Sequence, residues 1–205
     1  MDITYLGHSS FKLRGKTSVV VTDPYDPTVV GLKFPKHTTA DIVTVSHDHQ
    51  DHNAVGELEG ESFVVNGPGE YEIKGVGIVG LSVDKNTVYR IEIDGVSVVH
   101  LGDVGHVLTA DQVDSLDGVD VLIVPVGGVY TVDAAGAAQI VHEVEPSIVI
   151  PMHYGRPELN QKTLGGLAPV AAFLKEMGKE GVQSQPKLVI TKEKIPEEMQ
   201  VVVLE

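Results

Sequence analysis

The apolar positions in the first half of the chain fall into short segments separated by turn residues, a pattern typical of β-strands. β-Branched residues are frequent in these segments, and glycine, proline, asparagine and aspartate stand between them. The sequence Asp94-Gly95 predicts a tight hairpin between two of the segments. A loop is expected over residues 25–37, and residues 53–58 could form a short helix. The strands predicted here are 3–6, 10–13, 17–23, 42–45, 63–65, 71–73, 76–83, 88–93 and 96–101.

After residue 103 the pattern changes, and apolar runs alternate with amphipathic segments. Continuous apolar runs are typical of strands that are covered on both faces. Thr109 and Asp133 are of the residue types that cap helices, and each precedes a helical pattern. The chain therefore reads as one α/β domain over residues 1–205, with β-sheet inside and helices outside. Its second half is predicted to contain strands at 119–124, 148–150, 187–190 and 201–204, and helices after Thr109, at 134–143 and at 168–177.

The composition narrows the class of protein. With 42% hydrophobic residues the chain is typical of a folded globular protein, and no apolar run approaches the roughly 18 to 20 residues of a membrane span. The start lacks the basic region and apolar core of a signal peptide, and together with the lack of cysteine this fits a cytoplasmic protein without demanding one. The net charge of −14 and the lack of any lysine- or arginine-rich run argue against a nucleic-acid partner. Because there is no cysteine, any bound metal must use imidazole and carboxylate ligands.

A cluster of histidines directly follows the predicted strand 42–45. Three of the nine histidines fall within the six positions 47–52, with an aspartate between the second and third. Neutral imidazole suits zinc and other late first-row ions, and aspartate adds charge and accepts harder ions. The alternative is a polar loop with surface histidines, but their density here favours a metal site. The residues proposed as ligands are His47, His49, Asp51 and His52.

The motif His47-x-His49-x-Asp51-His52 after an apolar strand resembles the signature of the metallo-β-lactamase superfamily of metal-dependent hydrolases. Further motifs, in matching order over nearly the whole chain, resemble its small lactonase-like, UlaG-like branch of Zn-dependent hydrolases. They are Gly7-His8-Ser9-Ser10-Phe11, Thr22-Asp23-Pro24, His100-Leu101-Gly102-Asp103, Pro125-Val126-Gly127-Gly128 with Tyr130-Thr131, and Pro151-Met152-His153-Tyr154. The fold that this resemblance implies is α/β, a four-layer αββα sandwich with the site at one sheet edge.

The resemblance also implies roles for single residues. His47 and His49 would bind a first ion, Asp51, His52 and His153 a second, and Asp103 would bridge the two ions. The ions would be zinc, with manganese or iron as alternatives. Asp51 would position or deprotonate the attacking water, and His153 or Tyr154 would stabilise the developing oxyanion. Asp23 would orient a ligand by hydrogen bonding, and the candidates for substrate contact are Tyr130, Thr131 and Arg156.

One feature of the superfamily is missing. The first metal position needs a third histidine between the cluster and the Gly-Asp motif, yet residues 53–99 contain none. The stretch 80–86, where that ligand is expected, is short, with Ser82 or Asp84 the nearest polar substitutes. Three outcomes remain open: an empty pocket, an unequal pair of ions, or a single ion. The single ion would be bound by Asp51, His52, Asp103 and His153.

The sequence also leaves the roles of the remaining histidines open. His8 could lie in a ligand shell, support the site by hydrogen bonding or have a purely structural role, whereas His106 is expected to support a loop. His37 and His142 are expected at the surface.

The leading function is hydrolysis of a small ester, lactone, thioester or phosphate ester, with neither nucleic acid nor membrane as partner and a homo-oligomer possible. The alternative is a catalytically reduced binding or sensing module, and a nuclease is disfavoured by the acidity.

Overall fold

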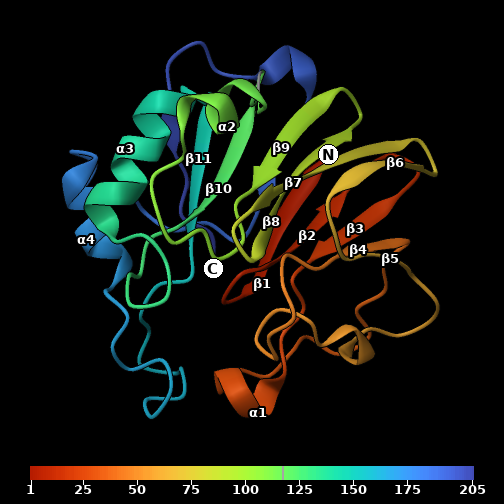
Figure 1. Ribbon diagram of the computed structural model, residues 1–205, viewed down its shortest axis with the longest axis horizontal. Coiled ribbons are helices and arrows are strands. Elements are labelled where there is room, and N and C mark those ends of the chain that lie inside the picture. The colour runs from red at the N-terminus through yellow and green to blue at the C-terminus, as the bar shows by residue number, and fades with distance from the viewer. Residues whose placement is uncertain (117) are drawn as a thin grey trace.

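Two β-sheets pack face to face, as Figure 1 shows. The computed structural model describes residues 1–116 and 118–205. The first sheet has six strands in the order β12-β1-β2-β3-β4-β5, of which β3, β4 and β5 are parallel to one another. Its strands are β1 (Asp2–Gly7), β2 (Ser10–Arg14), β3 (Val19–Thr22), β4 (Ile42–Thr44), β5 (Phe63–Val65) and β12 (Leu188–Val189).

The second sheet has seven strands in the order β13-β11-β10-β9-β8-β7-β6. Strands β6 to β9 are joined antiparallel, and β9, β10, β11 and β13 are parallel. The expected hairpin at Asp94-Gly95 joins β8 to β9, and both residues have positive φ (54° and 78°), as a tight turn requires. The strands are β6 (Gly69–Ile73), β7 (Val76–Val83), β8 (Asn86–Ile93), β9 (Val96–His100), β10 (Val121–Pro125), β11 (Ile148–Met152) and β13 (Gln200–Val201).

The alternation of side chains along each strand divides the apolar residues between an inner core and the outer faces. Ile3 of the first sheet and Ile123 and Ile150 of the second belong to one buried cluster between the sheets. The residues on either side of Ile123, Leu122 and Val124, belong instead to the cluster on the outer face of the second sheet. Because β10 is buried on both faces, it shows the continuous apolar run that the sequence analysis identified.

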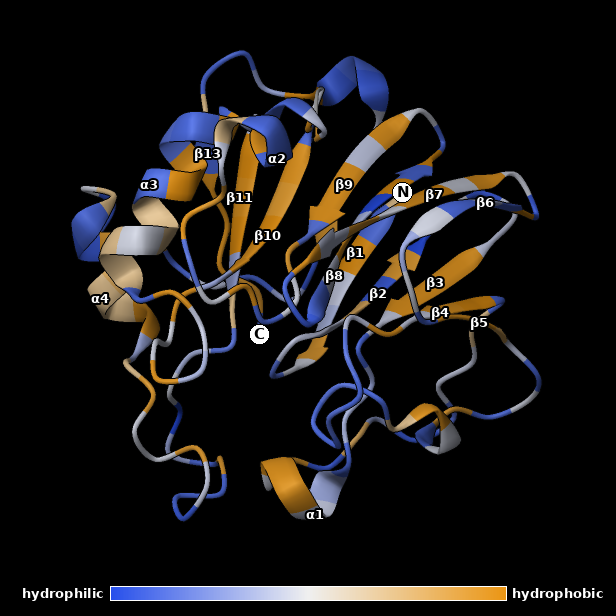
Figure 2. Cartoon of the chain, in the orientation of Figure 1, coloured by the Kyte–Doolittle hydropathy of each residue, from blue (hydrophilic) through white to orange (hydrophobic). Residues whose placement is uncertain are grey.

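Two helices cover the outer face of the second sheet. Helices α3 (Ala134–Val144) and α4 (Val170–Glu176) contact each other and pack on β10 and β11, whose apolar character is visible in Figure 2. As predicted, the Asp133 side chain caps α3 by accepting a hydrogen bond from Gly136 N–H. Thr109 caps the short helix α2 (Ala110–Asp114) in a capping box with Gln112. The expected αββα sandwich is confirmed, with this pair of helices as one outer layer.

The helical segments between the strands of the first sheet are much shorter. The loop expected over 25–37 contains a helix, α1 (Pro27–Val30), which the sequence analysis missed. Its signals are local: the Asp26 side chain accepts from Thr28 N–H, and proline is tolerated at the first helical position. The helix expected at 53–58 is only a 3-10 turn, Val55–Glu57, because Leu58 turns to an extended conformation. The second 3-10 turn is Lys192–Lys194.

The strands run so that their carboxyl ends meet at one edge of the sandwich. Strands β3 and β4 of the first sheet and β9 and β11 of the second end there, and each is followed by a polar segment. Within the described ranges, 1–116 and 118–205, no helix is long and apolar enough to cross a membrane. The closing strands β12 and β13 are shorter than expected, with two residues each.

Candidate metal centre

Segments that are far apart in the sequence bring histidine and aspartate side chains to this edge. His8 lies in the turn between β1 and β2, and Asp51 and His52 lie in the loop after β4. Asp103 follows β9, and His153 directly follows β11. Open α/β sheets place their ligand sites outside the carboxyl ends of their strands. The five side chains therefore converge because of the direction in which the strands run.

His8 and His153 have an unusual backbone conformation and are joined by a backbone hydrogen bond. Both residues have positive φ, 54° and 51°, a conformation that costs about 1 to 3 kcal/mol for residues other than glycine. They are tied together because the N–H of His153 donates to the carbonyl of His8 at 3.0 Å. The hydroxyl of Tyr5 donates to the same carbonyl at 2.9 Å. The strain is thus offset by a fixed arrangement that places both imidazoles in the interior, where they are 1% and 0% exposed.

Four donor side chains form a compact group. His8, Asp51, His52 and His153 can each offer one ligand atom, and these atoms all lie within 4.8 Å of one another. Oδ2 of Asp51 is 3.2 Å from Nε2 of His8 and 3.6 Å from Nε2 of His52. Asp103 adjoins the group, with Oδ1 3.2 Å from Nε2 of His52 and Oδ2 3.4 Å from Nε2 of His153.

A second donor group is smaller and shares members with the first. It consists of His47, His52 and Asp103, with Nε2 of His47 3.9 Å from Oδ2 of Asp103. His49 is exposed, and although its ring centroid is 4.5 Å from that of His47, it belongs to neither group. The side of the site formed by His47 and His49 therefore offers fewer convergent donors than the side formed by His8 and His153.

Asp23 orients the histidine loop through hydrogen bonds to Ser46 and His52. Its buried carboxylate accepts from the backbone N–H of Ser46 at 2.8 Å and from the Ser46 hydroxyl at 2.6 Å. Its Oδ2 also lies 2.8 Å from Nδ1 of His52. When Nδ1 of His52 donates to this carboxylate, the bare Nε2 faces Asp51 and Asp103, which is how metal-bound imidazoles are usually held.

Asp103 is positioned by the tip of the β7–β8 hairpin. The buried Asn86 side chain donates to the carbonyl of Leu101 at 2.8 Å and accepts from the N–H of Asp103 at 3.0 Å. Gly102 lies between them with φ of 56°, and a Cβ there would be 2.3 Å from Oδ1 of Asn86 and 2.6 Å from Cβ of Ser46. Only glycine fits this close approach, so the Gly-Asp sequence is required by packing.

The buried ionisable groups shift one another's pKa values. Burial opposes ionisation of Asp103, but the positive charges of His52 and His153 hold its pKa well below the usual range. Burial opposes protonation of His52, yet Asp103 and Asp23 raise its pKa well above 6.5. Burial, aided by the charge of His153, lowers the pKa of His8 to about 4. Ionised carboxylates thus face a group of imidazoles, and the arrangement attracts positive charge.

These donors fit a metal ion. Among the residues that the structure describes, several buried polar atoms of the cluster have no hydrogen-bond partner. A buried polar atom without a partner costs about 1 to 3 kcal/mol, so such a concentration needs an explanation. A cation would satisfy Nε2 of His52, Nε2 of His153 and Oδ1 of Asp103, and imidazole with carboxylate is a donor set that zinc, iron and manganese accept. The unpaired atoms are Nδ1 of His8, Nε2 of His52, both ring nitrogens of His153 and Oδ1 of Asp103.

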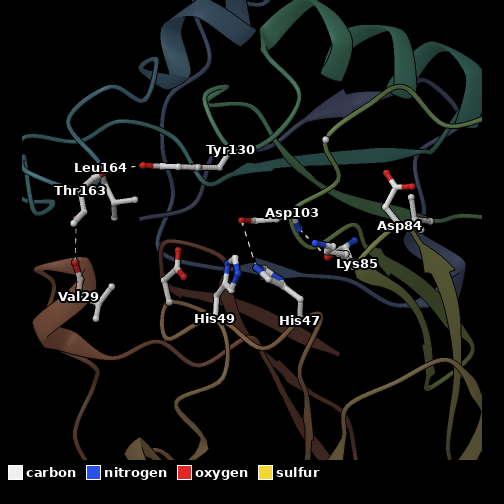
Figure 3. A pocket seen from close by; sticks show the side chains of 13 residues that line it. Val29, His47, His49, Asp84, Lys85, Asp103, Tyr130, Thr163 and Leu164 are labelled. Atoms are coloured by element: carbon white, nitrogen blue, oxygen red, sulfur yellow. Dashed lines mark hydrogen bonds and ion pairs between the residues drawn. The ribbon is translucent and has the colours of Figure 1, made fainter.

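A cavity of about 780 Å³ opens over the site. Figure 3 shows His47, His49 and Asp103 on one side of it and Tyr130, Thr163 and Leu164 on the other. The hydroxyl of Tyr130 donates to the carbonyl of Thr163 at 3.1 Å, which joins two loops into that far wall. Asp51 also lines the cavity, together with Val29, Val83, Asp84, Lys85, Asn86 and Gly105. The cavity is therefore apolar on one wall and rich in donors on the other.

Several other candidates lie elsewhere. Tyr154 is 6% exposed and belongs to the core on the outer face of the second sheet, with its ring stacked 6.3 Å from that of Tyr5. Thr131 is buried, and its hydroxyl donates to the carbonyl of Val132. Arg156 pairs with Glu158 at 3.5 Å. None of the three predicted candidates lines the cavity, so of the substrate contacts expected from the motifs only Tyr130 does so.

His100, His106 and His37 contact protein groups outside the two donor groups. His100 is fully buried, with Nε2 donating to the carbonyl of Ser9 and Nδ1 accepting from Gly102 N–H. His106 lies 3.1 Å from Asp84 at the rim of the hairpin. His37 is exposed and lies 2.8 Å from Glu59.

Three residues that shape the site were not predicted from the sequence. Ser46 links Asp23 to the loop, Asn86 positions Asp103, and Lys85 lines the cavity. The position of Ser46 at the start of the cluster was a usable signal. Asn86 and Lys85 carry no motif, and only the folding of the hairpin against residues 101–103 brings them to the site.

The chain is a two-sheet sandwich with histidine and aspartate donors at the carboxyl ends of its strands. The family model described as a beta-lactamase superfamily domain matches residues 2–153, and the chain belongs to this family. A UPF0173 metal-dependent hydrolase of Thermoplasma acidophilum is 28% identical over 193 residues, which cover 78% of this chain and 85% of that protein.

Solved structures agree with this assignment. A Thermotoga maritima protein proposed to be a Zn-dependent hydrolase of the metallo-β-lactamase superfamily is 37% identical, with a TM-score of 0.84. The match covers 100% of this chain and 98% of that chain. The metallo hydrolase Igni18 of Ignicoccus hospitalis, 23% identical over 93% of this chain and 99% of that chain, has the same fold with a TM-score of 0.61. The superfamily expected from the histidine motif is therefore confirmed.

Proposed function

We propose that this protein is a hydrolase of small esters, lactones or phosphate esters that depends on a divalent cation, with zinc as the first candidate. The observation that carries the proposal is the group of unpaired, buried donor atoms next to an open cavity, which Asp51 and Asp103 line. Asp51, His52, Asp103 and His153 would hold the cation. The relatives are metal-dependent hydrolases by name, which supports the same reaction class.

The chemistry follows from charge. A divalent cation at this site would lower the pKa of water toward neutrality and polarise the oxygen of the scissile group. Asp51 lines the cavity and remains ionised, because the hydrogen bond from His8 and the charge of His52 outweigh burial and lower its pKa. Its carboxylate would accept a hydrogen bond from the attacking water and orient it. Asp23 and Ser46 would keep His52 in the required tautomer.

The walls of the cavity suggest the kind of substrate. Val29, Val83 and Leu164 provide apolar surface, and Tyr130 provides an aromatic ring at the mouth, where it is 56% exposed. Lys85 is the one lysine or arginine among the described residues that line the cavity. A substrate with a short apolar chain and an anionic group would match this combination. The volume of about 780 Å³ falls within the range of small-molecule sites.

The test is metal analysis combined with hydrolysis. Protein purified without chelator should contain near-stoichiometric zinc, manganese or iron and should hydrolyse compounds from a panel of 4-nitrophenyl esters, γ-lactones and phenyl phosphate. Chelation should abolish turnover and the same ion should restore it. His142→Ala, on the exposed side of α3, is the matched control and should behave as the unmodified protein. Failure to bind any of these ions under any loading condition would overturn the proposal.

One observation favours a second candidate, a binding or sensing module that keeps the cation site without turnover. The side formed by His47 and His49 has few convergent donors, since His49 belongs to neither donor group. For this candidate, the protein should bind a cation stoichiometrically, yet none of the three substrate classes should be hydrolysed faster than in the buffer with free ion. Turnover above that background would exclude it.

A further inference from the structure

His8 occupies a place in the site that the motifs did not assign. It is 1% exposed, it lies in the turn between β1 and β2, and its Nε2 faces the carboxylate of Asp51 at 3.2 Å. We propose that His8 is a direct ligand of the cation, so that a single ion is held by three imidazoles, those of His8, His52 and His153. Asp51 and Asp103 would provide the carboxylates. This inference rests on the proposed function only in that a divalent cation binds at the site.

The spacing of the donors supports the ligand role. Zinc bonds to nitrogen and oxygen are about 2.0 to 2.2 Å long, and tetrahedral geometry then separates neighbouring donors by about 3.3 to 3.6 Å. The distances from Oδ2 of Asp51 to Nε2 of His8 and Nε2 of His52 are 3.2 and 3.6 Å. The donor atom of His153 completes the group within 4.8 Å of the others. The two measured separations thus match those of neighbouring donors on one ion, and the remaining separations within the group are no longer than 4.8 Å.

The number of donors within reach also supports one ion. Three imidazoles crowd together, with the ring centroid of His8 4.2 Å from that of His153 and 5.5 Å from that of His52. Asp51 and Asp103 place their carboxylates beside these rings, so one divalent cation could be bound by all five side chains. A second ion would have to rely on His47 and the exposed His49, with Asp103 already shared.

The fold positions His8 more rigidly than a supporting hydrogen bond requires. Its carbonyl accepts from both Tyr5 and His153, and its φ of 54° keeps the backbone in the left-handed region. The preceding Gly7 has φ of 117°, and a Cβ there would approach the hydroxyl oxygen of Tyr25 to 2.8 Å. His8 therefore adopts a backbone conformation that is unfavourable for a residue other than glycine, and Gly7 before it permits the turn that directs the imidazole into the site. Such local strain is typical of functional positions.

A pair of substitutions separates ligation from hydrogen bonding. In His8→Gln the amide can still donate to Asp51 but cannot replace an imidazole as ligand, whereas His8→Ala removes both interactions. The protein loaded with Co²⁺ reports coordination through its visible absorption, and zinc affinity is measured by competition with a chromophoric chelator. X-ray absorption of the zinc-loaded protein counts the imidazoles. His106→Gln, close to the cavity but outside both donor groups, is the matched control.

We expect one ion and three imidazoles per chain. His8→Gln and His8→Ala should both lose at least about 100-fold in zinc affinity, since even residues that only support metal ligands cost 10- to 100-fold, and both should change the Co²⁺ spectrum. His106→Gln should keep both properties. If His8→Gln retains unmodified affinity and spectrum while His8→Ala loses them, His8 is a hydrogen-bonding support and the inference is wrong. Two ions per chain would also overturn it, while leaving the proposed hydrolase intact; no ion at all would overturn both proposals.

Discussion

The site has two sides that differ in how completely they are built. On the buried side, His8, Asp51, His52 and His153 converge within 4.8 Å, and three of the four are essentially inaccessible to solvent. On the open side, His47 is the one histidine that reaches a donor group, at 3.9 Å from Asp103, while His49 is exposed. Residues of both sides belong to the motif at positions 47–52, so the motif alone does not show that one side has more convergent donors than the other.

The difference follows from what supports each side. The buried side draws on strands of both sheets and on Asp23, which is itself fully buried and holds His52 and Ser46. The open side depends on one loop and on the tip of the β7–β8 hairpin, which contributes Asp84 and Lys85. Preorganised donors require neighbours that fix them, and the open side has few. We therefore expect the buried side to bind the cation and the open side to face the substrate.

The largest effect should come from Asp103, the carboxylate shared by both sides. Asp103→Asn removes a negative charge that lies 3.2 Å from His52 and 3.4 Å from His153. Metal affinity should fall by more than about 100-fold, because a ligand should matter more than the groups that support it. Competition with a chromophoric chelator measures this, and Asp111→Asn on the exposed side of α2 is the control. Unchanged affinity would mean that Asp103 is not a ligand.

Asp23 tests whether support determines the strength of the buried side. Asp23→Asn keeps the size of the side chain but weakens the interaction with Nδ1 of His52, now 2.8 Å from the carboxylate. Metal affinity should decrease by roughly 10- to 100-fold, the usual effect of losing a group that orients a metal-bound imidazole. Asp48→Asn, an exposed aspartate of the same loop, should change little. Equal effects of the two substitutions would remove the special role of Asp23.

Lys85 tests the role of the open side in substrate binding. Lys85→Ala should raise KM for the anionic mono-4-nitrophenyl ester of glutaric acid by about 2- to 5-fold, as expected for an exposed ionic contact. KM for neutral 4-nitrophenyl valerate should not change, and Lys85→Arg should keep both values. Lys162→Ala, an exposed lysine outside the residues that line the cavity, is the control. A parallel change for both esters would show that charge is not the reason.

The smallest effect is expected at His49. Because its ring is exposed and outside both donor groups, His49→Ala should leave the number of bound ions unchanged and alter metal affinity by no more than about 2-fold. Elemental analysis and the chelator competition measure both quantities. Loss of an ion from this variant would show that the open side holds a cation of its own, and the contrast between the two sides would disappear.

Most of the fold could be predicted from the sequence because its signals are local or periodic. The alternation in β1 and β2, the continuous apolar runs of β10 and β11, and the Asp133 cap each specify their element directly. Helix α1 was missed, since a four-residue helix has too few positions for a periodic pattern. The resemblance to known hydrolases added the sandwich architecture, which depends on long-range packing and which local patterns do not specify.

Part of the candidate site could likewise be predicted from the sequence, and the rest depends on the tertiary structure. The sequence by itself predicted a metal site at the histidine cluster, because metal-binding residue types stand out where an apolar strand ends, and the resemblance to known hydrolases added Asp103 and His153 as predicted ligands. Only the tertiary structure decided that His8 joins His153, through a left-handed turn and a backbone hydrogen bond across the two sheets, and that His49 stays outside. The physical reason is that ligand geometry depends on atoms within a few ångströms of one another. Residues 8 and 153 acquire that relation only when β1 and β11 end at the same edge.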